Sequence, residues 1–233
     1  MTMIGDDLQQ VNNRIAKACV TAGRDPAGVR LLAVSKTFGP EAVREAHAAG
    51  QSAFGENYVQ EGLDKIEALA DLRASLEWHC IGPLQSNKTR PVAEHFDWVH
   101  SIDRLKIAER LSAQRPAHLA PLNVCLQVNV DGGANKSGVT PDEALPLAQA
   151  VAALPQLRLR GLMAIPEPAP DFAAQRELFL RAHALYESIR RAGIAFDTLS
   201  LGMSADLEAA ISAGSTMVRV GTAIFGGRAR KAG

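Results

Sequence analysis

The sequence has few cysteines, no net charge and no long hydrophobic run, and each absence excludes a class of protein. Its three cysteines, Cys19, Cys80 and Cys125, are far apart and form no C-x-x-C pair, so neither a disulfide framework nor a zinc site is indicated. Basic and acidic residues balance at 25 each, and nothing points to a nucleic-acid partner. No apolar run approaches the roughly 18 residues that span a bilayer, and the chain does not open like a signal peptide. We therefore expect a cytoplasmic protein with no membrane partner, and we expect a monomer.

What the sequence does contain is a regular alternation of strand-like and helix-like segments. Apolar residues spaced by three and four predict a helix over residues 4–22, which Gly23 ends. From residue 29 onward, apolar runs that are typical of buried strands alternate with helical patterns. The eight predicted strands are residues 29–35, 52–55, 76–81, 98–101, 123–130, 157–165, 198–201 and 216–220.

This alternation predicts the fold. Strands that alternate with helices form a parallel sheet, and eight such units in roughly 200 residues favour a closed (β/α)₈ TIM barrel. The alternative is a doubly wound open sheet, but no G-x-G-x-x-G follows the first predicted strand. We predict one α/β domain over residues 1–233, with an extra N-terminal helix in residues 1–23 and a short tail in residues 226–233.

The carboxyl ends of the strands are where such a barrel carries its functional residues. Lys36 ends the first predicted strand, and Gly39-Pro40 then begins a helix. A desolvated lysine at this position can be a nucleophile toward a carbonyl, although a surface lysine that simply ends a strand gives the same pattern.

The last two strand ends suggest a phosphate site, which in these barrels is commonly formed by the loops after strands 7 and 8. Ser204 follows the seventh strand, where we expect it to cap the next helix and to face an anion. Gly221 allows close approach of the backbone, and Thr222 adds a second hydroxyl. Taken singly, Ser204 can be only a cap and Gly221 only a turn. Together with Lys36, they fit two ligand classes, a phosphorylated sugar as in a lysine-dependent aldolase, and pyridoxal phosphate.

Five segments of the chain resemble the pyridoxal phosphate homeostasis proteins, the YggS/PROSC family. They are residues 33–37 (AVSKT), 54–58 (FGENY), 79–88 (HCIGPLQSNK), 199–206 (LSLGMSAD) and 218–226 (VRVGTAIFG). The resemblance spans nearly the whole chain, and its H-x-I-G-x-L-Q-x-N-K and G-M-S-x-D segments are specific. A small departure is Leu201, which stands where the family pattern has methionine.

The resemblance implies a barrel like the N-terminal domain of alanine racemase. It implies that Lys36 holds pyridoxal phosphate as a Schiff base, that Asn57 lies beside the ring and that Arg219 faces the pyridine nitrogen. It also implies that the phosphate is held by Ser204, Gly221 and Thr222. Because an arginine is always charged, Arg219 disfavours protonation of the ring nitrogen, which makes the ring a weaker electron sink.

The family role implied is intracellular homeostasis of vitamin B6. The protein would hold the cofactor without catalytic turnover, with no catalytic residue, and would pass it to apo-enzymes that depend on pyridoxal phosphate. The alternative is an amino-acid racemase. Racemases of this barrel type bring a second β domain and a tyrosine from a neighbouring subunit, whereas this chain stops just after its last strand, so we expect no such domain.

Several other residues are given structural interpretations. His79, Ile81 and Met163 also lie near strand ends, and we interpret His79 as a hydrogen-bonded core residue. Lys88 and the loop at residues 135–138 are interpreted as solvated. Tyr186 is expected to pack against the fold, and no His, Asp or Glu cluster has the spacing of a metal site.

Overall fold

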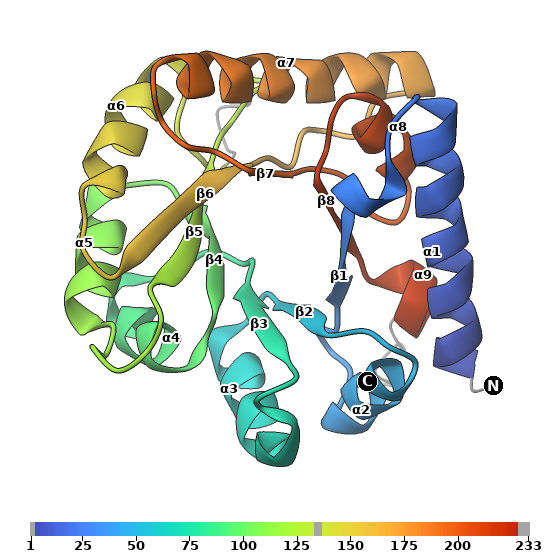
Figure 1. The fold of residues 1–233 in the computed structure, drawn as a ribbon, viewed down its shortest axis with the longest axis horizontal. Helices are drawn as coiled ribbons and strands as arrows, with labels where there is room; N and C mark the ends of the chain where they lie inside the picture. The colour runs from blue at the N-terminus through green and yellow to red at the C-terminus, as the bar shows by residue number, and fades with distance from the viewer. Residues whose placement is uncertain (1–2, 133–136, 228–233) are drawn as a thin grey trace, which may run out of the picture.

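The computed structural model describes residues 3–132 and 137–227, which form a closed barrel of eight parallel strands surrounded by helices (Figure 1). Each strand pairs with the next one along the chain, and β8 returns to pair with β1. The TIM barrel predicted from the sequence is thereby confirmed. The strands are β1 (Arg30–Val34), β2 (Ala53–Glu56), β3 (Glu77–Cys80), β4 (Trp98–Ile102), β5 (Leu122–Gln127), β6 (Leu157–Met163), β7 (Thr198–Ser200) and β8 (Met217–Val220).

The helices cover the outside of the barrel. They are α1 (Met3–Thr21), α2 (Pro40–Ala48), α3 (Val59–Ala68), α4 (Thr89–His95), α5 (Leu105–Gln114), α6 (Pro141–Ala152), α7 (Phe172–Arg191), α8 (Leu207–Ser212) and α9 (Thr222–Phe225), with 3₁₀ turns η1 (Pro26–Gly28), η2 (Ala70–Leu72) and η3 (Ser86–Lys88). Residues 228–233 of the predicted tail, and residues 135–136 of the predicted solvated loop, lie outside the described part of the chain. Among the described helices, none combines the length and apolar character needed to cross a membrane.

Local sequence signals explain where several helices begin. Pro40 occupies the first turn of α2, where its missing amide hydrogen costs nothing. At the start of α6, the Glu143 carboxylate accepts a hydrogen bond from the Thr140 amide at 3.0 Å, which is part of a capping box. Asp103 precedes α5 but does not cap it. The Asp103 carboxylate binds the guanidinium of Arg104 at 3.0 Å instead of the backbone of α5.

The core has two parts. The larger part lies between the sheet and the helices and includes alternate strand residues, such as Leu31 and Ala33 of β1. Two small apolar groups, formed by separate sets of strand residues, lie apart from it. They comprise Leu32, Ala53 and Met217, and Trp98, Cys125 and Met163. Because strand residues alternate between faces, these groups fill the interior of the barrel, where His79 stacks on Trp98.

Helix α1 precedes the barrel and packs against α8, α9 and α2 (Figure 1). Its Arg14 guanidinium binds the Glu208 carboxylate at 2.8 and 3.0 Å and donates to the backbone carbonyl of Ser204 at 3.0 Å. The extra N-terminal helix therefore does more than cover apolar surface, because it fixes the loop that follows β7.

Candidate ligand-binding site

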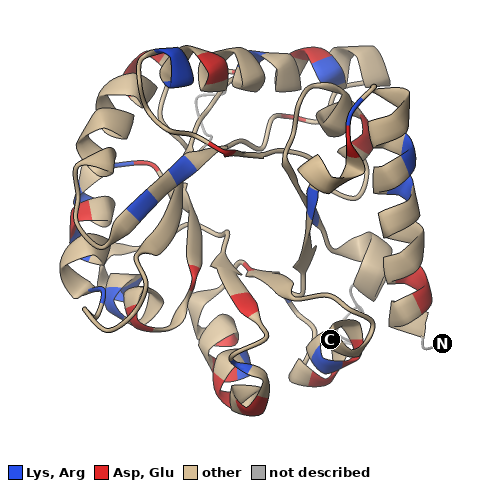
Figure 2. Cartoon of the chain, in the orientation of Figure 1, with Lys and Arg blue, Asp and Glu red and all other residues tan. Residues whose placement is uncertain are grey.

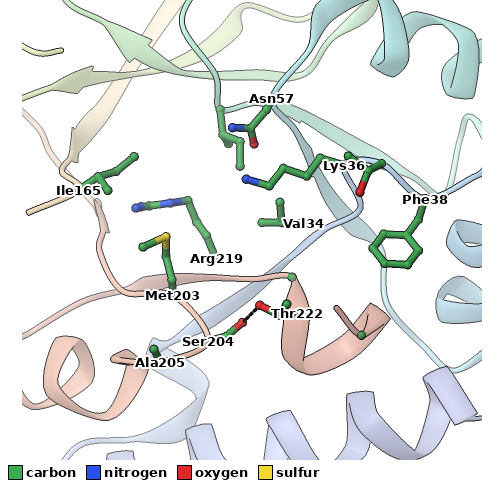
Figure 3. Close-up of a pocket in the computed structure, with 14 residues that line it drawn as sticks. Val34, Lys36, Phe38, Asn57, Ile165, Met203, Ser204, Ala205, Arg219 and Thr222 are labelled. Atoms are coloured by element: carbon green, nitrogen blue, oxygen red, sulfur yellow. Dashed lines mark hydrogen bonds between the residues drawn. The ribbon is translucent and has the colours of Figure 1, made fainter. Parts of the chain in front are cut away.

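A pocket of about 370 Å³ opens at the carboxyl ends of the strands, and it is the size of a small-molecule site. All six residues that were expected to hold the cofactor line this pocket. Figure 3 shows the Lys36 amine reaching into it, with Asn57 on one side and the Ser204–Thr222 pair across from it. The lining residues are Val34, Lys36, Thr37, Phe38, Asn57, Ile81, Ile165, Met203, Ser204, Ala205, Arg219, Gly221, Thr222 and Gly226.

Lys36 is half-buried. Both of its neighbours in the sequence are held by hydrogen bonds to side chains of β2 and α3. On one side is Ser35, which is fully buried. Its hydroxyl donates to the Glu56 carboxylate at 2.5 Å, and its carbonyl accepts from Lys65 Nζ at 2.7 Å. On the other side is Thr37, whose amide donates to the Glu61 carboxylate at 2.5 Å. The backbone that carries the Lys36 side chain is therefore anchored at both ends.

A buried lysine holds this anchoring network together. Lys65 Nζ donates to the carboxylates of Glu56 at 2.7 Å and Glu61 at 2.8 Å, and the Lys65 and Glu56 side chains are almost fully enclosed. Burial raises the pKa of Glu56, and the Lys65 charge and hydrogen bond oppose that rise. A charge pair of this kind is costly to break, because the remaining partner would be an uncompensated buried charge.

Asn57 follows β2 and presents an unsatisfied group at the pocket. Its Oδ1 atom is buried and has no hydrogen-bond partner among the described residues. Its backbone lies against Gly82, where an added Cβ would come within 2.0 Å of the Asn57 carbonyl oxygen. Glycine at position 82 thus allows the loops after β2 and β3 to touch, which holds Asn57 against the pocket.

The loops after β7 and β8 meet, as expected, but Ser204 is not the cap of α8. That helix begins at Leu207 with Asp206 as its N-cap residue, and the Asp206 carboxylate instead accepts from the Met203 amide at 2.6 Å. Ser204 lies two residues earlier and faces α9. Its Oγ is 3.4 Å from both Thr222 Oγ1 and the Ala223 amide nitrogen. These distances are at the long limit of a hydrogen bond, so the two hydroxyls and the amide are available to an anion between them.

Gly221 allows the loop after β8 to lie close to the end of β1. A Cβ at this position would lie 3.1 Å from the Val34 carbonyl oxygen. Such a contact is tighter than side chains normally tolerate, so a larger residue would displace β8 from β1 at the pocket.

Arg219 comes from β8 and is 4% exposed. Its Nη1 atom donates to the Ser200 carbonyl and hydroxyl oxygens, both at 2.7 Å, and its Nη2 atom donates to the Ala164 carbonyl at 3.1 Å. Burial lowers the pKa of Arg219 to about 10, against the opposing charge of Asp206. The guanidinium therefore stays charged at neutral pH and brings a fixed positive charge to the pocket.

The rest of the lining is apolar and contains few groups that titrate. Val34, Phe38, Ile81, Ile165 and Met203 form the walls. Sequence reasoning noted Ile81 and, within the G-M-S-x-D segment, Met203, but it did not single out Val34, Phe38 or Ile165, although each lies within a few residues of a predicted strand end. Among the described residues, the pocket lining contains no His, Asp, Glu, Cys or Tyr. Figure 2 shows that charged residues of both signs are spread over the surrounding helices, with no face of one sign in this view.

Other sequence interpretations can be compared with the structure. His79 is fully buried and hydrogen-bonded, so its interpretation as a core residue is confirmed. Met163 is in the barrel interior and does not line the pocket. Tyr186 is buried and stacks on Phe196, and Lys88 is exposed.

Comparison with known proteins gives a consistent result. Residues 7–229 match the family model described as alanine racemase, N-terminal domain. A pyridoxal phosphate homeostasis protein of Pseudomonas aeruginosa is 62% identical over 228 residues, covering 98% of this chain and 97% of the relative. Its Escherichia coli counterpart is 56% identical over 229 residues, covering 98% of both. Among solved structures, PipY of Synechococcus elongatus with PLP bound has a TM-score of 0.79 at 38% identity, covering 91% of this chain and 100% of PipY.

Proposed function

The chain belongs to the alanine racemase N-terminal domain family and, within it, to the pyridoxal phosphate homeostasis proteins, and on this basis we propose that it binds pyridoxal phosphate covalently at Lys36. One observation carries the proposal. Lys36 and the hydroxyls of Ser204 and Thr222 line the same pocket, which matches a ligand that has an aldehyde at one end and a phosphate at the other.

The binding step uses the amine of Lys36 as the nucleophile. Nζ attacks the aldehyde carbon, a C=N bond forms, and the aldehyde oxygen leaves as water. Ser204 and Thr222 donate their hydroxyl hydrogens to phosphate oxygens, and the Ala223 amide donates from the start of α9. The 3.4 Å separations among these groups support this assignment, because an anion between them would satisfy donors that are only weakly paired with one another.

Asn57 and Arg219 contact the ring. The buried Asn57 Oδ1 has no partner among the described residues, and a polar substituent of the ligand would satisfy it. Arg219 lies toward the pyridine nitrogen and keeps that nitrogen unprotonated, because two positive charges in direct contact repel. Pyridoxal phosphate supplies an electron-withdrawing ring when bound, and Arg219 limits that property.

The described pocket lining has no second proton-transfer group, and this supports a protein that holds the cofactor rather than one that catalyses a reaction with it. Racemisation needs a base on each face of the substrate, whereas the described lining offers the Lys36 amine and no His, Tyr, Cys or carboxylate across from it. We propose that the protein buffers the reactive aldehyde and passes it to apo-enzymes that use pyridoxal phosphate. It acts in the cytoplasm as a monomer, with no nucleic-acid partner and no catalytic residue. Three buried, unpaired cysteines fit a reducing compartment.

The test is reduction of the loaded protein with borohydride, followed by peptide mass mapping. We expect the pyridoxyl group on Lys36, and we expect Lys36→Ala to lose the visible absorbance of the covalent adduct. Lys106→Ala, which changes an exposed lysine on α5, is the matched control and should behave as wild type. An adduct located elsewhere would overturn the proposal. Exchange of the α-proton of alanine in deuterated water at enzyme-like rates would instead favour a racemase.

A further inference from the structure

A continuous line of hydrogen bonds crosses the barrel interior and ends at the pocket. Glu77 Oε1 is 2.6 Å from His79 Nε2, and His79 Nδ1 is 2.9 Å from His100 Nε2. His100 Nδ1 is 3.2 Å from Ser200 Oγ, which is 2.7 Å from Arg219 Nη1. We call these five residues the Glu77–Arg219 chain. Its three middle members are fully buried, so their side chains have no access to bulk water.

The direction of every bond in the chain follows from its two ends. Arg219 can only donate, so Ser200 Oγ accepts from it and gives its own hydrogen to His100 Nδ1. The hydrogen of His100 is then on Nε2 and is donated to His79 Nδ1. The hydrogen of His79 is likewise on Nε2 and is donated to Glu77, whose carboxylate can only accept.

The protonation states agree with this assignment. Burial lowers the pKa of His79, against the effect of Glu77, and burial lowers the pKa of His100 well below its ordinary value. Both rings are therefore neutral at neutral pH, and each has one donor and one acceptor nitrogen. The opposite direction would require His79 to donate from both nitrogens, which only a protonated ring can do.

The far end of the chain lies at the other mouth of the barrel. Glu77 is the first residue of β3, and the Arg30 guanidinium binds its carboxylate at 2.8 Å. The chain thus links a negative charge at the amino ends of the strands to the positive charge in the pocket. Hydrogen bonds in such a series polarise one another, which strengthens each of them in a water-free interior.

We propose that Glu77, His79, His100 and Ser200 are positioning residues that orient the Arg219 guanidinium toward the ligand ring. A serine hydroxyl alone can rotate and can either donate or accept. Because His100 takes its hydrogen, the Ser200 oxygen must present its lone pairs to Arg219, and the guanidinium plane is fixed. The orientation of Arg219 belongs to the protein itself, and only its effect on the ligand rests on the proposed function.

The first test reads the tautomers in the cofactor-free protein. In a variant whose other four histidines, His47, His95, His118 and His183, are replaced by Gln, long-range ¹H–¹⁵N spectra contain only the two chain rings. We expect both to be neutral with hydrogen on Nε2 at neutral pH. Hydrogen on Nδ1 in either ring, or a protonated ring, would overturn the proposal.

The second test removes single links of the chain. Ser200→Ala deletes the hydroxyl but keeps the carbonyl that Arg219 also contacts, so we expect faster rotation of the guanidinium, seen as merging of its Nη signals. Ser200→Thr keeps a hydroxyl and should preserve the wild-type signals. Unchanged Arg219 signals in Ser200→Ala would show that the chain does not orient the guanidinium.

If Ser200→Thr does not fold, a variant that removes only a charge from the chain still tests the proposal. Glu77→Gln should move the ring ¹⁵N signals of both His79 and His100, because the polarising charge is lost. Glu67→Gln removes a charge from an exposed carboxylate on α3 that is outside the chain, and it should leave them unchanged. A shift confined to His79 would contradict the proposal.

A loaded sample then tests the effect on the ligand. With ¹⁵N-labelled pyridoxal phosphate bound, Ser200→Ala should shift the ring nitrogen signal toward the protonated form. If the ligand does not bind at Lys36, the proposed function fails, but the spectra of the cofactor-free protein still decide whether the chain orients Arg219.

Discussion

The backbone amide of Thr37 donates a 2.5 Å hydrogen bond to the carboxylate of Glu61, and this bond holds the residue after Lys36 in a left-handed conformation with a φ of 69°. Such a conformation costs a residue with a branched Cβ on the order of 1–2 kcal/mol. The loop after β1 therefore takes its shape from α3, which belongs to the next unit of the barrel. The direction in which Lys36 points is set by this contact between units.

We predict that Glu61→Ala lowers both stability and the rate of adduct formation at Lys36. The change removes the acceptor of the Thr37 amide and one acceptor of Lys65, so the loss of unfolding free energy should be about 1.5–3 kcal/mol. Urea unfolding and the time course of visible absorbance after adding pyridoxal phosphate measure the two effects. Glu67→Ala, on the exposed side of the same helix, is the control. Equal rates in the two variants would show that Glu61 does not set the loop.

Lys65→Met should be more destabilising. It leaves Glu56 buried without its charged partner, and loss of one member of a buried pair costs about 3–5 kcal/mol. The burial that already raises the pKa of Glu56 would then be opposed by the Ser35 hydrogen bond without the help of Lys65, so the variant should gain stability as pH falls. Lys106→Met on α5 serves as the exposed comparison. A loss below about 1 kcal/mol would mean that the pair contributes like a surface salt bridge.

Gly82→Ala should disturb Asn57 without touching the ligand. Its Cβ would come within 2.0 Å of the Asn57 carbonyl oxygen, so the two loops must separate. We expect a destabilisation of about 1–3 kcal/mol and weaker binding of pyridoxal phosphate. Gly28→Ala is a matched control, because a Cβ there meets nothing within 4 Å. Calorimetric titration of both variants measures the binding, and identical affinities would contradict the expectation.

Glu77 should contribute a defined part of the acid sensitivity of the fold. Burial opposes its ionisation, but the hydrogen bond with His79 and the charge of Arg30 hold its pKa at about 2, below the ordinary 4.5. The unfolded state thus binds a proton first as pH falls, so the stabilisation is complete above about pH 4.5 and is lost between about 4.5 and 2. After allowance for the partial exposure of Glu77, this stabilisation amounts to roughly 2 kcal/mol.

Glu77→Gln should therefore show a smaller loss of unfolding free energy than wild type over this pH range, measured by urea unfolding at stepped pH. Glu67→Gln is the exposed control and should follow wild type. Parallel curves for Glu77→Gln and wild type would show that the carboxylate has no special environment.

The thiols should be unreactive in the folded protein. All three cysteines are buried, and burial raises the pKa of Cys80 and Cys125 to about 12. A colorimetric thiol reagent at mildly alkaline pH should find almost no reaction in the native state and three equivalents after denaturation. Rapid reaction of one equivalent in the native state would contradict the burial of that residue.

The barrel and the strand-end residues Lys36, Ser204, Gly221 and Thr222 could be predicted from the sequence because they depend on local patterns, whereas Asn57 and Arg219 were assigned by family resemblance. Hydrophobic periodicity locates the eight strands, and the rule that parallel strands end at one mouth brings Lys36 and Thr222 together. The supporting contacts depend on register, which periodicity does not report. In the sequence, Lys65 is an ordinary charged residue of a helix, yet its amine binds the carbonyl of Ser35, the residue before Lys36. Likewise, nothing local to Ser204 reveals that Arg14 holds its carbonyl from 190 residues away.

The pairing of β8 with β1 bears on how the protein is made. The residues that meet across this seam, from Arg30↔Met217 to Ala33↔Val220, belong to the first and the eighth strands, so they are synthesised far apart in time. A nascent chain that has not yet released β8 from the ribosome has Lys36 but no partner loop for it. If Lys36 binds the cofactor as proposed, capture must therefore wait until β8 and the loop after it have been made, and products that end before β8 would not compete for it.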